Sequence, residues 1–262
     1  MNYNYHAHTT WCSHATGTPE MYVERAIEGG ILHFGFSDHF PFRFPDGTGL
    51  YWRVQLEDVE DYVEKINSLK NIYGDKIDIK VGFEMEYYPD YFDSMLKNAL
   101  KWGAEYLILG QHFIKSEYER PESYFHSVSP HESIDELVTY ADGVCAAIRS
   151  GVFSYVAHPD IFRFTGDADI YRLQMRKICE ASRECGVPLE INLLGIRENR
   201  HYPNEAFWEI AGEVGSPVLF GFDAHDASAA FDGESIPVAE AIVKKYNLNY
   251  ISEPKLVLLK EK

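Results

Sequence analysis

Short apolar runs and longer amphipathic stretches alternate seven times along this chain of 262 residues, without an interruption. Such alternation is typical of strands joined by crossover helices, which together make a parallel sheet. The strand-like runs are at 2–8, 32–36, 77–84, 106–110, 153–158, 187–192 and 218–223. The helix-like stretches are at 19–28, 56–73, 91–102, 133–149, 170–185, 204–214 and 237–246.

Helix boundary signals agree with this division of the chain. Thr18 precedes Pro19, which suits the first turn of a helix, and Gly74, Gly151 and Gly186 stand where helices should end. No Ser/Gly-rich linker divides the sequence, so we expect residues 1–262 to form one domain. Seven units predict an α/β fold of the TIM type, a (β/α)7 barrel, with an open doubly wound sheet as the alternative. No Gly-x-Gly-x-x-Gly follows the first strand to favour a dinucleotide fold.

Histidines and acids gather at the carboxyl ends of the predicted strands, where β/α barrels place their active sites. His6 and His8 close the first strand with a two-residue spacing, which turns both imidazoles to one face. His14 follows in the next loop. The remaining ligand-type residues, in strand order, are Asp38 and His39, Glu84, His112, His158, and Asp223 with His225.

Taken singly, each of these residues has a plain structural explanation as a hydrogen-bonded loop side chain. Together they would bring many imidazoles and carboxylates into one pocket, where they would repel or desolvate one another unless cations held them. The pattern therefore predicts a metal centre. His33 lies at the opposite end of its strand and is expected to be structural, and His126, His131 and His201 lie in loops.

Charge and composition limit the partners of this protein. The formal net charge is −17, from 24 basic and 41 acidic residues, which argues against a nucleic-acid groove. No stretch approaches the roughly 20 apolar residues of a membrane span, and the first five residues lack the features of a signal peptide. We therefore expect a cytoplasmic protein without nucleic-acid or membrane partners. Its four scattered cysteines, including Cys12 near the histidines, are expected to be reduced thiols.

In this order, the motifs from His6-x-His8 to Asp223-x-His225 resemble those of the PHP (polymerase and histidinol phosphatase) family. The resemblance covers essentially the whole chain, and it implies a distorted seven-stranded barrel with three divalent metal ions, either Zn, Fe or Mn. By that resemblance, His6, His8, Glu84 and Asp223 would bind the first ion. Glu84 would bridge to a second ion held by His112 and His158. The third ion would take His14, His39 and His225.

Within the family, the chain resembles the histidinol-phosphate phosphatase branch of histidine biosynthesis. The segment from Leu189 through Asn192 to Arg197, followed by Tyr202 and Pro203, resembles the phosphate-binding loop of that branch. The resemblance implies that Arg197, Arg163 and Asn192 contact the substrate. Gln111 before His112, and Leu193 and Leu194 after Asn192, depart from the pattern of the branch.

These motifs lead to a prediction of metal-dependent hydrolysis of a phosphomonoester, with L-histidinol phosphate as the expected substrate. A hydroxide held between two cations would attack phosphorus in line, because bound cations lower the pKa of water to about 7. Glu84, Asp223, His225 and Arg197 are the expected catalytic residues. The loop at 114–130 is a candidate cover for the substrate.

Two alternatives stay open at this point. A PHP phosphoesterase acting on a nucleotide or another small phosphorylated metabolite would carry the same metal centre. A metal-binding module without activity would need closed coordination, which usually includes cysteine, and the expected ligand set has none.

Overall fold

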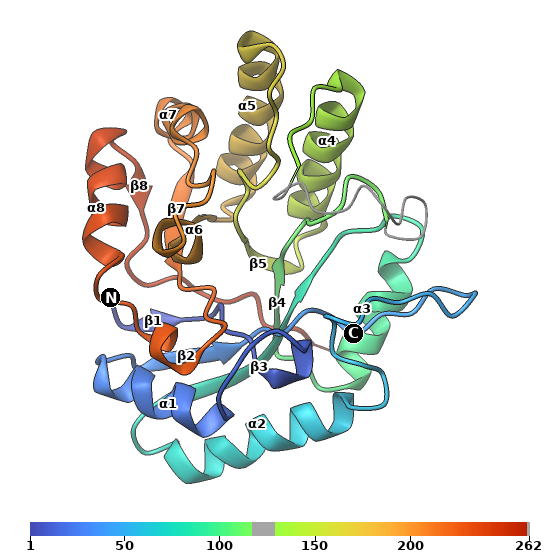
Figure 1. Ribbon diagram of the computed structural model, residues 1–262, viewed down its shortest axis with the longest axis vertical. Helices are drawn as coiled ribbons and strands as arrows, with labels where there is room; N and C mark the ends of the chain where they lie inside the picture. The colour runs from blue at the N-terminus through green and yellow to red at the C-terminus, as the bar shows by residue number, and fades with distance from the viewer. Residues whose placement is uncertain (117–128, 261–262) are drawn as a thin grey trace.

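A curled, all-parallel sheet of eight strands forms the centre of the computed structural model, which describes residues 1–116 and 129–260 (Figure 1). The strands follow one another in sequence order, as the predicted crossover connections require. Their bounds are β1 Tyr3–Asn4, β2 His33–Phe36, β3 Asp78–Met85, β4 Tyr106–Leu109, β5 Phe153–Val156, β6 Leu189–Asn192, β7 Pro217–Gly221 and β8 Asn249–Tyr250.

Helices occupy the outer side of this sheet (Figure 1). All seven predicted helices are present, and a short extra one, α6, directly follows β6. Their bounds are α1 Pro19–Glu28, α2 Val59–Tyr73, α3 Phe92–Lys101, α4 Ile134–Ser150, α5 Ala168–Cys185, α6 Leu193–Arg197, α7 Glu205–Val214 and α8 Ile236–Lys245, with 3-10 turns η1 at Thr10–Cys12 and η2 at Ala227–Ala230. Gly151 and Gly186 end α4 and α5 in the left-handed conformation, as expected for helix-terminating glycines.

The expected count of seven strands was wrong by one. β8 adds two residues beside the start of β7, where Asn249 and Tyr250 pair with Pro217 and Val218. At the other end of β7, the chain beyond it joins the chain beyond β1 through a parallel bridge between Ala7 and Ala224. The amide of His8 donates to the carbonyl of Ala224 over 2.8 Å. The segments that follow β1 and β7 thus meet at the carboxyl-end mouth, and β8 is added at the opposite end of β7.

Aromatic side chains fill the interior of the curled sheet. Tyr106 of β4 is fully buried, and its hydroxyl donates to the carbonyl of Tyr5 over 2.9 Å. A Cβ on Gly35 or Gly82 would stand 2.2 Å from the Tyr106 side chain. The two glycines therefore make the space that this tyrosine occupies.

The C-terminal segment runs across the end of the sheet opposite the mouth. The amide of Leu259 donates to the carbonyl of Glu105, and the amide of Val257 donates to the Ser154 hydroxyl. Leu256 packs on the cluster of interior tyrosines. This end is thus covered, and the carboxyl ends of the strands remain as the open face. Within the residues described, no helix combines the length and apolarity that crossing a bilayer requires.

Candidate metal centre

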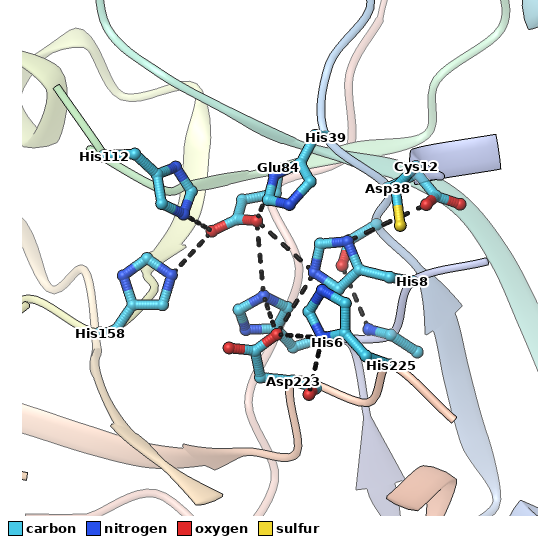
Figure 2. Close-up of polar contacts among 12 residues, drawn as sticks. His6, His8, Cys12, Asp38, His39, Glu84, His112, His158, Asp223 and His225 are labelled. Carbon is cyan, nitrogen blue, oxygen red and sulfur yellow. Dashed lines mark hydrogen bonds and ion pairs between the residues drawn. The ribbon is translucent and has the colours of Figure 1, made fainter. Parts of the chain in front are cut away.

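Imidazoles and carboxylates from the ends of six strands meet in one cluster at the mouth of the sheet (Figure 2). His6 and His8 follow β1, His39 follows β2, and Glu84 belongs to β3. The other members are His112 after β4, His158 after β5, and Asp223 and His225 after β7. The alternation predicted for His-x-His is kept although β1 ends at Asn4, because both rings enter the cluster.

Glu84 lies at the centre of the cluster. Its Oε1 is 2.9 Å from His158 Nε2 and 3.5 Å from His112 Nε2. Its Oε2 is 3.0 Å from His39 Nδ1, and 3.5 Å from His8 Nε2. One carboxylate therefore stands between two groups of imidazoles, which is the arrangement that a bridging ligand needs.

Asp223 completes the half of the cluster that β1 supplies. Its Oδ1 is 3.5 Å from His6 Nε2 and 3.4 Å from His8 Nε2. The ligand-type atoms of these three residues all lie within 4.8 Å of one another. His6 and His8 are fully buried.

Within the described residues, several polar atoms at the centre of the cluster have no hydrogen-bond partner. They include Nε2 of His6, Nε2 of His8 and Oε2 of Glu84. Buried polar atoms are rarely left unsatisfied, and each one costs about 1–3 kcal/mol. Here Nε2 of His6 and Nε2 of His8 lie 3.7 and 3.5 Å from Glu84 Oε2, beyond hydrogen-bonding distance. His39 Nδ1 is 3.0 Å from the same oxygen but forms no hydrogen bond with it. Divalent cations that accept imidazole and carboxylate ligands would satisfy them, so the residues fit a metal.

The electrostatics of the cluster are those of a cation site. Burial opposes the ionised form of Glu84, but His112, His39 and His6 still hold the pKa of this carboxylate well below its usual range. Burial and the neighbouring His225 lower the pKa of His8 to about 3. Glu84 and His8 thus have the ionised and neutral forms in which a carboxylate and an imidazole bind metal. In His6 and His112, by contrast, burial is outweighed by neighbouring carboxylates, which raise the pKa of both imidazoles.

The three histidines expected at a third ion also lie near one another. The ring centres of His14 and His225 are 4.6 Å apart, and those of His14 and His39 are 5.4 Å apart. His14 is exposed, and its Nδ1 lies 2.7 Å from the carbonyl of Cys12. The sulfur of Cys12 lies within 4.8 Å of ligand atoms of His14 and His225, although the resemblance gave Cys12 no role.

Two buried acids that the sequence did not single out as supports hold the cluster in place. Glu190 of β6 is fully buried, and its Oε2 lies 2.8 Å from His6 Nδ1. Glu86 Oε1 lies 3.0 Å from His112 Nδ1, and its Oε2 accepts from the Arg53 guanidinium over 2.7 Å. Each carboxylate fixes which ring nitrogen of its histidine faces the centre. Glu86 lies two residues after Glu84, and Glu190 lies two residues before Asn192. This spacing, which places both members of each pair on the same face of a strand, is the sequence feature that could have identified the two acids.

Asp38 and Asp160 are also held by structural contacts. Asp38 accepts from the amide and the hydroxyl of Thr9, and its Oδ1 is 3.9 Å from His8 Nδ1. Asp160 Oδ2 accepts from the amide of Asn204 and from the Trp208 indole. Both acids are thus engaged by groups beside the cluster.

Backbone geometry shows that the cluster is closely packed. His158 and Asp223 have φ angles of 31° and 47°, in the left-handed region that residues with a side chain seldom adopt. A Cβ on Gly110 would stand 2.0 Å from Glu84 Oε1, and a Cβ on Gly221 would stand 1.9 Å from Glu190 Oε2. Strained residues and obligatory glycines are typical of sites that the surrounding fold holds in one arrangement.

A cavity of about 480 Å³ opens onto the cluster. Cluster residues form its floor, and aromatic, aliphatic and charged side chains form its walls. The wall residues are Tyr51, Trp52, Ile161, Leu194, Glu198, Arg200 and Tyr202. A cavity of this size suits a small metabolite.

Arg200 is the arginine that lines this cavity among the residues described, in place of the expected Arg197 and Arg163. The Arg197 guanidinium donates to Asp232 Oδ2 over 3.0 Å and to the carbonyls of Phe222 and Asp223. It is therefore committed to the backbone behind Asp223. Arg163 is exposed at the surface.

Asn192 is buried behind the cluster, where both ends of its amide are engaged. Its nitrogen donates to Glu190 Oε1 over 2.7 Å and to Asp223 Oδ2 over 3.0 Å, and its oxygen accepts from the amide of Gly195. These contacts orient Asp223 and begin α6, and the expected contact of Asn192 with substrate stays a prediction. The expected covering loop at 114–130 lies mostly outside the described residues. Tyr51 and Trp52, from the loop after β2, line the cavity instead.

Comparisons with known proteins agree with this site. A family model described as PHP domain matches residues 4–193. A probable histidinol-phosphatase of Deinococcus radiodurans is 29% identical over 84% of this chain and 85% of its own length. The histidinol-phosphatase of Bacillus subtilis is 25% identical over 85% of this chain and 92% of its own length.

A solved structure shares the fold. It is a histidinol phosphate phosphatase of Lactococcus lactis in complex with zinc, L-histidinol and phosphate. The two chains superpose with a TM-score of 0.72 over 99% of each, at 20% identity.

Proposed function

This chain belongs to the PHP domain family, and we propose that it is a metal-dependent phosphomonoesterase that hydrolyses L-histidinol phosphate to L-histidinol and phosphate. The observation that carries the proposal is the set of unsatisfied imidazole and carboxylate atoms around Glu84, on the floor of a cavity of metabolite size. L-histidinol phosphate is proposed as the substrate because relatives that align over most of their length are named as histidinol-phosphatases.

Three divalent ions are proposed, held by the ligand sets that the family motif implies. His6, His8, Glu84 and Asp223 would bind one ion. Glu84, His112 and His158 would bind a second. His14, His39 and His225 would bind a third. The mixed imidazole and carboxylate donors suit Zn, Fe or Mn. Bound there, the cations would lower the pKa of a water to about 7 and neutralise charge on the phosphate.

Arg200 takes the role of anion contact in this proposal, because it lines the cavity that contains the cluster. A guanidinium matches two phosphate oxygens with parallel hydrogen bonds. Arg197 would act indirectly by holding the carbonyls at Phe222 and Asp223. Tyr51, Trp52 and Tyr202 would pack against the organic part of the substrate.

The proposal takes residues 1–262 as one catalytic domain that works in the cytoplasm on a small substrate. The continuous eight-stranded sheet supports a single domain, and the net charge of −17 argues against a nucleic-acid substrate. Nucleic acid is not proposed as a substrate.

Steady-state kinetics on the metal-loaded protein test the function. We expect kcat/KM for L-histidinol phosphate to exceed the values for a nucleoside monophosphate, a bis-phosphorylated nucleotide and p-nitrophenyl phosphate. A chelator should abolish turnover, and Mn or Zn should restore it. A higher kcat/KM for a nucleotide would show that the same metal centre acts on a different substrate. Turnover that survives complete metal removal would refute the proposal of metal-dependent hydrolysis.

A further inference from the structure

Glu198 is an acid of the cavity that the metal cluster does not use. The acids lining the cavity among the described residues are Glu84, Asp223 and Glu198. The first two face the imidazoles, whereas Glu198 stands at the rim, with about half of its side chain exposed. A carboxylate at the rim of an otherwise aromatic wall is available to a ligand.

The neighbouring Arg200 orients this carboxylate. Nε and Nη2 of Arg200 donate to Glu198 Oε2 over 2.9 and 2.7 Å. Both bonds go to the same oxygen, and no partner of Glu198 Oε1 is found in the described part of the chain. Nη1 of Arg200 donates to the Tyr202 hydroxyl over 2.8 Å, so the guanidinium is itself held against the cavity wall. The rim thus presents one cation and one anion side by side.

A tight loop fixes this pair relative to the metal cluster. The amide of Arg200 donates to the carbonyl of Gly195 over 2.9 Å, and the amide of Glu198 donates to that of Leu194. A Cβ on Gly195 would stand 2.3 Å from the carbonyl oxygen of Tyr202, so the loop is closely folded on itself. Asn192 anchors its start by capping α6 and contacting Asp223.

The other acids near the cluster are already committed to buried partners. Glu86 is 1% exposed and lies between Arg53 and His112. Asp38 and Asp160 are buried against Thr9 and Trp208. Each would have to lose a partner to meet a substrate cation, at a cost that Glu198 does not incur.

We infer that Glu198 binds the ammonium group of the substrate and makes this enzyme selective for phosphomonoesters that carry an amine. The inference rests on the proposed function and adds a specificity-determining residue to it. A phosphate that contacts Arg200 brings a second anion to the guanidinium, and the substrate's ammonium group gives Glu198 a second cation. The pair then recognises a molecule that carries both charges.

The test compares two substrates that differ only in the amine, L-histidinol phosphate and 3-(imidazol-4-yl)propyl phosphate. The measured quantity is the ratio of their kcat/KM values, in which effects on the shared phosphate cancel. We expect a wild-type ratio well above one and a fall of about tenfold or more in Glu198→Gln, because hydrogen bonds to charged groups contribute at this level. Glu198→Lys should lower the ratio further. Either a wild-type ratio near one or an unchanged ratio in both variants would overturn the inference.

Glu205→Gln is the matched control, because Glu205 is 78% exposed and paired with Lys245 away from the cavity. It should leave the ratio unchanged, and thermal melting should show that all variants fold.

A second substrate pair, phosphoethanolamine and ethyl phosphate, separates this inference from the proposed function. If L-histidinol phosphate is a poor substrate but the amine ratio of the second pair still falls in Glu198→Gln, the proposed substrate fails and the role of Glu198 stands. If L-histidinol phosphate is preferred over other phosphomonoesters but neither ratio depends on Glu198, the proposed substrate stands and the role of Glu198 fails.

Discussion

Glu190 Oε2 lies 2.8 Å from Nδ1 of His6, and this contact turns the opposite ring nitrogen toward Glu84 and Asp223. Both partners are fully buried. The side chain of Glu190 comes from β6, a strand that supplies no direct member of the cluster. The sixth strand therefore contributes by orienting a side chain of the first.

Replacement of Glu190 by Gln should weaken metal binding. The amide keeps the size of the carboxylate but loses its charge, and partners of this kind typically change metal affinity by about 10–100-fold. Metal content after dialysis against buffered free zinc should fall, and phosphatase activity should recover at higher zinc. Metal content equal to that of the wild type at every zinc concentration would contradict the supporting role.

Gly110→Ala should disrupt the centre from the neighbouring strand. The added Cβ would stand 2.0 Å from Glu84 Oε1, so the carboxylate must move away from His158 and His112. We expect loss of bound metal and of activity. Gly143→Ala is the control, because a Cβ there meets nothing within 4 Å and lies within α4. It should raise stability by up to about 1 kcal/mol and leave metal content unchanged.

Arg53→Met should destabilise the fold. Arg53 and Glu86 are each 1% exposed, and removal of Arg53 leaves the buried carboxylate without its guanidinium partner, which costs about 3–5 kcal/mol. Urea unfolding would measure this loss. The double variant Arg53→Met with Glu86→Gln should recover part of it, because the unpaired charge is then gone. A double variant as unstable as the sum of the single changes would show that the two side chains act separately.

Arg200→Ala and Arg197→Ala should differ in their kinetics. Loss of the cavity arginine should lower kcat/KM for phosphomonoesters by about 10–100-fold, because charge-assisted hydrogen bonds to phosphate are lost. Loss of Arg197 frees Asp232 and the carbonyls behind Asp223, so we expect a lower melting temperature and weaker metal retention. A lower kcat/KM in Arg197→Ala alone, with a normal melting temperature, would show that Arg197 rather than Arg200 contacts the phosphate.

Thiol labelling of the native protein should detect one fast-reacting cysteine. Cys185 is exposed, whereas Cys12, Cys145 and Cys179 are buried. Burial raises the pKa of the Cys145 thiol to about 11, so little reactive thiolate exists at neutral pH. Ellman's reagent at pH 8 should therefore label about one thiol per chain rapidly, and Cys185→Ser should remove that phase. Rapid labelling in Cys185→Ser would show that a thiol regarded as buried is accessible.

The strand-end residues could be predicted to meet because parallel strands direct their carboxyl ends to one face, whatever the distance between them in sequence. His6 and Asp223 meet for this reason, although 216 residues separate them. Their roles as metal ligands stay predictions. The partner of Arg197 could not be predicted, because Asp232 reaches it only through the folded loop after β7. β8 was missed because two residues carry no detectable period.

The segments after β1 and β7 are joined at the mouth of the sheet by the bridge between Ala7 and Ala224, and members of the metal cluster lie on both sides of that bridge. His6 and His8 flank Ala7, and Asp223 and His225 flank Ala224. A cation shared by these side chains would cross-link the two segments at this bridge. Amide hydrogen exchange at residues 6–8 and 222–224 would then slow when metal is added. The exchange rate at this bridge would therefore measure how much of the protein carries metal.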